Sequence, residues 1–344
     1  MSLHSEIHEQ PAAIQNLLSK QAEIGRIAAE IRKIDPAYVF LAARGTSDNA
    51  GRYANYLWGA YNHLPVALST PSLFTYYKQS PKLTGALITS VSQSGRSPDI
   101  IAVVEEGKRQ GCAALAITNA PDSPLARASD FVIDIAAGPE KAVAATKTYT
   151  AELLAMALLS VELADDPLRR AELQQLPRWA EQVLALDEEI AGIAERFRYM
   201  EHCVVLGRGF NYATAFEWAL KIKELTYSLA EPYSSADFQH GPIAMVESGF
   251  PVFAAAPSGL VLPDLLKLLT SLRETHNAEL TIISDNAQVL ALAQSPIQIP
   301  AGIPEWLSPI IAIIPAQLFC YHLTRIRGFD TEAPRSIRKV TETH

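Results

Sequence analysis

The sequence has few cysteines and no long apolar run. Its three cysteines, Cys112, Cys203 and Cys320, lie far apart among apolar residues. No Cys-x-x-Cys pair or Cys/His cluster predicts a metal site, so we expect buried, reduced thiols in a cytoplasmic protein. The first ten residues lack the apolar core of a signal peptide. The most apolar stretch, residues 310–323, is shorter than a bilayer requires and contains a proline, so no membrane span is expected.

Positive charge is also scarce. The 29 Lys and Arg residues face 37 Asp and Glu residues, which gives a formal net charge of −8. Such an acidic chain is not expected to bind nucleic acid or an anionic membrane, and any anionic ligand must be held by local donors. Hydrophobic residues make up 49% of the 344 positions, enough for a sizeable core and for about two domains.

The chain contains an internal repeat. Landmark residues recur 164 positions apart in the pairs Gly45 and Gly209, Gly85 and Gly249, Ser94-Gly95 and Ser258-Gly259, and Gly138 and Gly302. Landmark glycines at one offset predict a tandem duplication of one structural unit.

Each copy alternates short β-rich apolar runs with helical stretches. In the first copy we predict strands near 38–43, 65–69, 86–91, 114–118 and 131–135, and helices near 47–62, 97–110 and 146–164. This alternation predicts an α/β fold in which each copy has a mainly parallel, doubly wound sheet with helices on both faces. Ligands should then bind beyond the carboxyl ends of the strands.

We expect five segments along the chain. They are an N-terminal helical segment (1–30), a first domain (31–165), a helical linker (166–197), a second domain (198–328) and a C-terminal tail (329–344). The linker should be interrupted near Pro177. Charged tails usually fray, but Pro334 and the apolar pair Ile337 and Val340 favour a tail that packs down.

A polar turn between a predicted strand and helix is the best candidate for an anion site. It offers the side chains of Ser92, Gln93, Ser94 and Ser97 around a flexible Gly95. Side-chain donors and free helix N–H groups suit a phosphate dianion without a lysine. An ordinary turn in which Ser97 caps the helix before Pro98 fits the pattern equally well. The second copy lacks the hydroxyl cluster, so its equivalent site should be degenerate.

A second turn should lie beside the first. Gly45 allows close approach of a ligand to the backbone, and Thr46 and Ser47 can bond ligand hydroxyls. Neither this turn nor Gly207-Arg208-Gly209 completes a GxGxxG pattern, so a nicotinamide cofactor is disfavoured.

Candidate proton-transfer groups lie in the second copy and the tail. Glu217, Lys221 and Glu224 share one helix face, a spacing that more often marks a solvated row of ion pairs. His240, in a polar loop predicted over 231–242, could open a sugar ring by proton transfer if a carboxylate lies near. Lys339 in the tail could bond a ligand or form an imine with an open-chain sugar.

These motifs resemble a known family. The matching segments are Ser92–Gly95, Ala144–Lys147, Lys221–Glu224, His240–Pro242 and Pro334–Lys339. In order and spacing they are similar to the isomerase half of glucosamine-6-phosphate synthase, which consists of two tandem sugar isomerase (SIS) domains. The resemblance covers essentially the whole chain. It implies two flavodoxin-like domains, a homodimer, a sugar 6-phosphate ligand, and no metal or organic cofactor.

The resemblance also implies roles for single residues. The phosphate-binding set would be Ser92, Gln93, Ser94 and Ser97, completed by Gly45, Thr46, Ser47 and the backbone at Val143 and Ala144. Glu224 would move the proton between C1 and C2, supported by Lys221 and Glu217. His240 of the neighbouring subunit would open the ring, and Lys339 would lie by the carbonyl carbon.

The chain departs from the family pattern at several positions. Arg44 stands where the family has cysteine, Arg96-Ser97 where it has Glu-Thr, and Ala145 where it has serine. These changes leave the exact sugar open. The chain enters the first unit directly after Met1, so we expect no glutaminase domain and no use of glutamine as an ammonia source. The resemblance therefore shifts to stand-alone double-SIS enzymes.

Three functions are compatible with this sequence. The first is conversion of glucosamine 6-phosphate to fructose 6-phosphate and ammonia. The second is a fructosamine-6-phosphate deglycase or an aldose–ketose phosphate isomerase. The third is a non-catalytic phosphosugar-binding regulator, which Glu224, Lys339 and the lack of a basic DNA-binding domain disfavour.

Overall fold

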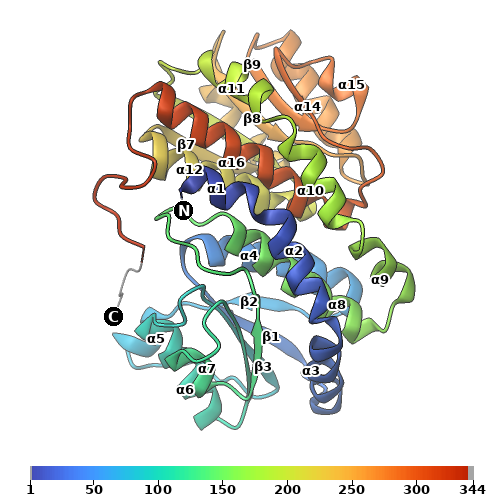
Figure 1. The fold of residues 1–344 in the computed structure, drawn as a ribbon, viewed down its shortest axis with the longest axis vertical. Helices are drawn as coiled ribbons and strands as arrows, with labels where there is room; N and C mark the ends of the chain where they lie inside the picture. Colours follow the sequence, from blue (N-terminus) through green and yellow to red (C-terminus); the bar gives the residue numbers. More distant parts are fainter. Residues whose placement is uncertain (1, 340–344) are drawn as a thin grey trace. The chain divides into compact units, whose positions relative to one another are not determined.

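The computed structural model describes residues 2–339, and its first sheet is parallel throughout (Figure 1). The strands are β1 (Tyr38–Ala42), β2 (Val66–Leu68), β3 (Ala86–Val91), β4 (Ala113–Thr118) and β5 (Phe131–Asp134). Their order is β2-β1-β3-β4-β5. This is the strand order of flavodoxin-like folds, so the order changes direction between β1 and β3.

The second sheet repeats this topology. Its strands are β6 (His202–Gly207), β7 (Leu229–Ser234), β8 (Pro251–Ala255), β9 (Glu279–Ser284) and β10 (Ser295–Gln298). They lie in the order β10-β9-β8-β6-β7, which is the same order read from the opposite edge. All its pairs are parallel. The predicted fold class, α/β with two mainly parallel sheets, is confirmed.

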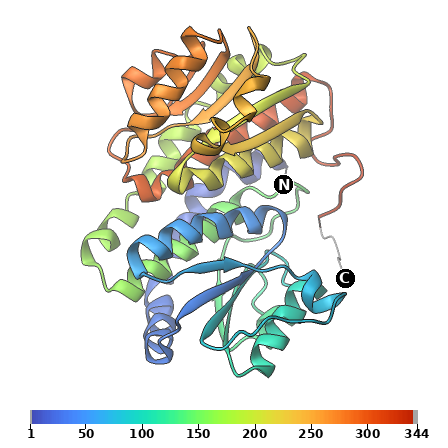
Figure 2. The same cartoon turned by 180° about the vertical axis from the view of Figure 1, so that it is seen from behind.

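Helices cover both faces of the first sheet (Figures 1 and 2). They are α4 (Gly45–Asn62), α5 (Ser72–Thr75), α6 (Pro98–Arg109), α7 (Pro124–Ala128) and α8 (Lys147–Ala164). Alternate strand residues such as Phe40 and Ile88 pack with Val104 of α6. The opposite face packs against α4 and α8. Strands buried on both faces read as continuous apolar runs, which is why the pattern predicted them well.

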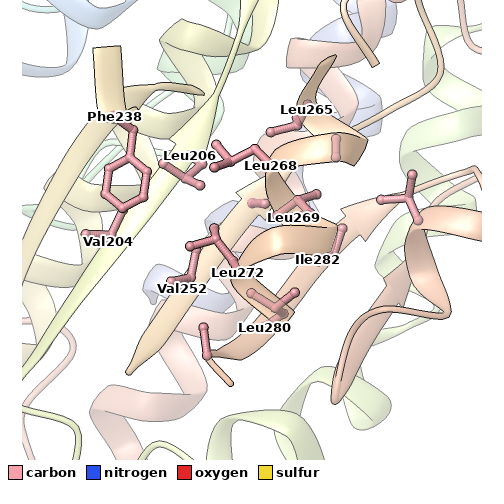
Figure 3. Close-up of a cluster of buried hydrophobic side chains, with 14 of the residues drawn as sticks. Val204, Leu206, Phe238, Val252, Leu265, Leu268, Leu269, Leu272, Leu280 and Ile282 are labelled. Carbon is pink, nitrogen blue, oxygen red and sulfur yellow. The ribbon is translucent and has the colours of Figure 1, made fainter. Parts of the chain in front are cut away.

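The second sheet is covered in the same way. Its helices are α12 (Tyr212–Thr226), α13 (Ser235–Phe238), α14 (Leu262–Glu274), α15 (Ala287–Leu290) and α16 (Ser308–Ile326), with short 3₁₀ turns at Gly209–Asn211, Pro242–Met245 and Glu305–Leu307. Figure 3 shows Val252 and Leu280 of the sheet packed against Leu268 and Leu272 of α14. The opposite face packs against α12 and α16.

The remaining helices precede the first sheet in the sequence or lie between the two sheets in the sequence. They are α1 (Leu3–His8), α2 (Gln10–Ser19), α3 (Gln21–Ile34), α9 (Pro167–Leu173), α10 (Leu176–Leu184) and α11 (Asp187–Glu195). The expected interruption near Pro177 falls two residues earlier, between α9 and α10. Pro177 itself lies in the first turn of α10, where the missing N–H has no helical partner to lose.

The chain forms two compact units, and each unit is made of segments that are not continuous in the sequence. Unit 1 comprises residues 1–11, 141–146 and 175–337, and unit 2 comprises residues 12–140, 147–174 and 338–344. The five segments expected from the sequence stay a prediction, and the part of the tail from Val340 to residue 344 lies outside the described residues.

One predicted loop is instead regular structure. Residues 231–242 begin inside strand β7 and continue through α13. The strand contains Pro232, a residue type that argues against a central strand. β7 is an edge strand, paired only with β6, so its proline disrupts no second ladder.

The most apolar helix is longer than the sequence pattern indicated. Residues 305–326 are long and apolar enough to cross a bilayer, so the length argument against a span was wrong. Burial is typical of a core helix instead, because 94% of the apolar window is buried inside the protein. The helix also continues through Pro315. Cys320 on this helix is buried, and Cys112 and Cys203 are likewise free and buried, as predicted.

The contact between α6 and the first sheet depends on Gly107. A β-carbon built there would lie 2.4 Å from Cγ1 of Ile88. We expect Gly107→Ala to lower the free energy of unfolding by about 1–3 kcal/mol through overpacking. In the control Gly59→Ala, no atom lies within 4 Å of the added carbon, and the variant should gain about 0.5–1 kcal/mol in helix propensity. Urea unfolding of both variants measures the difference, and equal effects would contradict it.

Candidate active site

Two turns meet at the carboxyl edge of the first sheet. Ala42 of β1 and Ser90 of β3 are register partners, so the chain leaves both strands at the same level. The turns that follow carry Gly45–Ser47 and Ser92–Ser97. Arg44 links them, because its Nε lies 2.8 Å from Oδ2 of Asp99, a fully buried carboxylate. The expectation that the two turns lie side by side is therefore confirmed.

The second sheet has the same link at the same place. Arg208 follows β6, and its guanidinium lies 3.5 Å from the carboxylate of Asp264 in the helix after β8. In both copies the arginine precedes a glycine with positive φ, Gly45 at 54° and Gly209 at 59°. The arginine–aspartate pair thus belongs to the repeated architecture. Arg44, which departs from the family pattern, has a structural partner.

Neighbouring segments hold the Ser92–Ser97 turn in shape. The N–H of Gly95 donates to Oγ of Ser92 at 3.1 Å, and the N–H of Asn119 donates to the carbonyl of Gln93 at 3.2 Å. Gly95 has a φ of 60°. A β-carbon there would lie 2.1 Å from Oγ of Ser123, so only glycine fits this position.

Three side chains of the turn are partly exposed to solvent. Ser97 occupies the N-cap position of α6, but its side chain makes no capping bond, which argues against an ordinary capped turn. Gln93, Ser94 and Ser97 are partly exposed, while Ser92 is buried. The N–H of Ile100 donates to the carboxylate of Asp99. The N–H of Ile100 is therefore taken by the protein itself, and the donors that this turn leaves are its side chains and loop backbone.

The Gly45–Ser47 turn opens helix α4. Gly45 has no atom within 4 Å of a hypothetical β-carbon, so a ligand has room to approach its backbone. The hydroxyl of Ser47 donates to Oε1 of Glu152 at 2.8 Å. Glu152 is a buried residue of α8 that the sequence reasoning missed. Because Ser47 donates to a carboxylate, its hydroxyl proton is directed away from any bound anion.

In the second copy, the equivalent turn is filled by the protein's own carboxylates. The N–H of Ser258 donates to Oδ1 of Asp285 at 2.6 Å, and the N–H of Leu260 donates to Oε2 of Glu305 at 2.8 Å. A β-carbon at Gly259 would lie 2.2 Å from the carboxyl carbon of Glu305. These two carboxylates occupy the donors that an anion would need, so the second turn is degenerate, as expected.

Two further predicted pocket residues belong to unit 1. Val143 and Ala144 lie in the segment 141–146, whose start is held by Glu6 of α1. Gln317 of α16 donates to the carbonyl of Thr146 at 3.3 Å, which holds its end. The Ser92–Ser97 turn lies in unit 2.

Lys339 of the tail pairs with a buried carboxylate in unit 2. Its Nζ lies 2.5 Å from Oε2 of Glu140, whose side chain is fully buried. Glu140 also accepts from the hydroxyl and the N–H of Thr148, at 2.8 Å and 3.2 Å. The sequence reasoning missed Glu140, because nothing local distinguishes it from a surface glutamate.

The face of α12 bears a buried lysine between two carboxylates. Nζ of Lys221 lies 3.1 Å from Oε1 of Glu217 and 2.5 Å from Oε2 of Glu224. Glu217 and Lys221 are essentially buried, whereas the side chain of Glu224 is 25% exposed. The row is therefore not a solvated surface feature. Only its last member, Glu224, can reach a ligand from solvent.

Burial and charge act on Lys221 in opposite directions. Burial alone would lower its pKa, but the carboxylates of Glu217 and Glu224 outweigh this and raise its pKa above the ordinary value. The lysine therefore stays charged at neutral pH. A fixed cation 2.5 Å from Glu224 holds this carboxylate in place.

His240 stands apart from these groups. It follows α13, is exposed, and precedes Gly241, which has a φ of 142°. Within residues 2–339 its side chain has no hydrogen bond or ion pair with another residue. The side chain of His240 therefore faces solvent.

The lysine of α12 can be tested through stability. Lys221→Met leaves Glu217 buried without this cation, and we expect a loss of about 3–5 kcal/mol in the free energy of unfolding. The double variant Glu217→Leu/Lys221→Met removes both charges, so most of the lost free energy of unfolding should be recovered. The raised pKa implies that the wild type keeps the contribution of this pair below pH 10.5 and loses it as the pH rises further. Urea unfolding at several pH values checks both points, and a double variant no better than the single one would contradict them.

Comparison with known proteins gives a consistent result. The sequence profile of the SIS domain matches residues 34–161 and 197–327. Glutamine–fructose-6-phosphate aminotransferase [isomerizing] of Thermococcus kodakarensis is 34% identical over 346 residues, covering 97% of this chain and 56% of the relative. The chain spans about half the length of the curated relatives it matches.

Solved structures agree. The C-terminal domain of glucosamine-fructose-6-phosphate aminotransferase from Francisella tularensis superposes with a TM-score of 0.88 at 30% identity, covering 96% of this chain and 98% of that one. Glucosamine-6-phosphate deaminase from Thermotoga maritima superposes with a TM-score of 0.74 at 20% identity, covering 97% and 100%, which shows a shared fold. With both sheets matched by the SIS profile, this chain belongs to the SIS domain family and contains two SIS domains.

Proposed function

We propose that the protein is a phosphosugar isomerase/deaminase that converts glucosamine 6-phosphate and water to fructose 6-phosphate and ammonia. The observation that carries the proposal is the Glu217–Lys221–Glu224 arrangement. It presents one partly exposed carboxylate, held by a buried cation, as a general base. The similarity to the C-terminal domain of the Francisella tularensis aminotransferase supports a sugar-phosphate substrate.

Glu224 would carry the central proton transfer. In the open-chain substrate it removes the proton from C2, and electrons move through C1 to the aldehyde oxygen, forming an enolamine. Return of the proton to C1 gives an imine at C2. Water adds to this imine and ammonia leaves, so the ketone of fructose 6-phosphate remains. Positioned acid–base catalysis of this kind contributes on the order of 10²–10⁴-fold.

His240 would open the sugar ring from a second subunit. Its exposed side chain has no partner within the described part of the chain, which fits a residue that acts on a neighbouring copy. The proposal therefore includes a homodimer. Lys339, paired with Glu140, is proposed to contact the carbonyl end of the open-chain sugar.

The Ser92–Ser97 turn would hold the 6-phosphate, with the backbone at Gly45 and Thr46. Ser94 and Ser97 are the partly exposed hydroxyls of this turn, and Gly95 allows its tight course. Val143 and Ala144 are proposed as further backbone contacts. This assignment explains how an acidic protein binds a dianion, because neutral donors and not net charge supply the attraction.

The base is tested by Glu224→Gln. This substitution keeps the shape of the side chain but removes its basicity, so kcat for ammonia release from glucosamine 6-phosphate should fall by at least 10²-fold. Glu274→Gln, an exposed glutamate at the end of α14, is the matched control and should be unchanged. Ammonia release by coupled assay measures both.

A panel of substrates separates the chemistries. Turnover of fructose 6-phosphate to an aldose phosphate, without ammonia from glucosamine 6-phosphate, would replace the proposal with an aldose–ketose isomerase. Release of amino acid from a fructosamine 6-phosphate would replace it with a deglycase. No turnover of any substrate, with Glu224→Gln indistinguishable from the wild type in binding, would reject an enzyme.

The phosphate turn is tested by a pair of serines from the two copies. Ser94→Ala removes a donor to a charged group, a loss of about 1.5–3 kcal/mol, so KM should rise roughly 10- to 100-fold with a smaller effect on kcat. Ser258→Ala changes the equivalent position of the second copy, where Asp285 and Glu305 take the backbone donors, and should leave KM unchanged. A similar rise in KM for both variants would contradict the assignment.

A further inference from the structure

Three helices of unit 1 bring three histidines to one carboxylate, and none of these four residues is among those assigned above. Asp187 is the first residue of α11. Its Oδ2 lies 2.7 Å from Nε2 of His4 and 3.1 Å from Nε2 of His8, both on α1. Its Oδ1 lies 2.6 Å from Nε2 of His322 on α16. Figure 1 shows α1, α11 and α16 in the fold.

The side chains in this cluster are of the kinds that bind transition-metal ions in proteins. The ligand atoms of His4, Asp187 and His322 lie within 4.8 Å of one another. Zinc binds histidine nitrogen and carboxylate oxygen at about 2.0–2.2 Å, so tetrahedral ligands lie about 3.3 Å apart. That spacing falls within the range of separations in this cluster, which begins at 2.6 Å between Asp187 and His322 and does not exceed 4.8 Å. Imidazole ligands favour zinc, cobalt, nickel or copper over magnesium and calcium.

The surroundings suit an ion that enters from solvent. The side chains of His4, Asp187 and His322 are 35%, 21% and 15% exposed. Solvent can therefore reach the site, although most of each side chain is buried. His4 and His8 lie one turn apart on α1, a spacing that places two histidines on one helix face for zinc. The ring of His4 also stacks on the ring of Tyr321, with 4.7 Å between the ring centroids. This contact limits the orientation of His4.

We propose that His4, Asp187 and His322, with His8 as fourth ligand, form a binding site for a divalent transition-metal ion of the zinc type. The sequence predicted no metal site because these ligands come from three distant segments. His4 and Asp187 lie 183 residues apart, and Asp187 and His322 lie 135 apart. The ion cross-links α1 to α11 and α16. Its binding involves none of the proposed catalytic residues.

The site is tested with tag-free, chelator-treated protein. Titration with zinc chloride should show one ion bound per chain, a rise in Tm that grows with zinc concentration, and reversal by EDTA. Magnesium at the same concentration should leave Tm unchanged. Cobalt should give the intense visible absorption of four-coordinate nitrogen and oxygen ligation.

Single variants locate the ion. His4→Gln and His322→Gln should each weaken zinc binding at least tenfold and abolish the cobalt spectrum. His276→Gln, a histidine of the same unit outside the cluster, is the matched control and should bind zinc like the wild type. If a histidine variant is misfolded by circular dichroism, Asp187→Asn, which is nearly isosteric, replaces it.

Each outcome decides the proposal. No binding of zinc at 10-fold excess over tens of micromolar protein, or binding unaffected in His4→Gln and His322→Gln, overturns it. Because metal binding is measured without sugar phosphate, failure here is separate from failure of the proposed activity.

Discussion

The parallel pairing of β1 with β3 is the constraint on which the first domain's candidate site depends. Their register, with Ala42 opposite Ser90, makes both strands end at one level, so the two polar turns leave the sheet together. The buried carboxylate of Asp99 then ties the second turn to Arg44 of the first. A charge buried without a partner is costly, so this pair fixes the relative position of the turns more firmly than packing alone would. The equivalent pair between Arg208 and Asp264 indicates that this link is part of the repeated unit.

The two domains share one topology, but the equivalent turns in them form different sites. In the first copy, the turn after β3 has neutral donors and partly exposed hydroxyls, which suit an external anion. In the second, Asp285 and Glu305 bond to the backbone of the corresponding turn and satisfy its N–H groups internally. A carboxylate from the chain itself has no association entropy to lose, so it outcompetes a free anion for the same donors. The second domain instead bears the buried Glu217–Lys221–Glu224 arrangement on α12.

Much of the fold was predictable because its signals are local. Strands buried on both faces are continuous apolar runs, and the predicted strands near 86–91 and 131–135 agree with β3 and β5 within one residue. Prediction failed where context overrides local pattern. The polar run over 231–242 suggested a loop, but its start belongs to the edge strand β7, which tolerates Pro232. The length of α16 was underestimated because Pro315 does not end that helix.

For the candidate site, the sequence by itself determined the kinds of donor and their order along the chain: a serine-rich turn, a Glu-Lys-Glu face and a histidine before Gly-Pro. Only the tertiary structure decided which of these groups are buried and what they pair with. The Glu-Lys-Glu spacing is the same on a solvated face as on a buried one, and burial of Lys221 distinguishes them. Glu140 with Lys339, Glu152 with Ser47, and Asp187 with His4 and His322 are pairings that no local pattern indicates, because these partners lie distant in sequence. Long-range packing creates those environments, and no window of neighbouring residues contains that information.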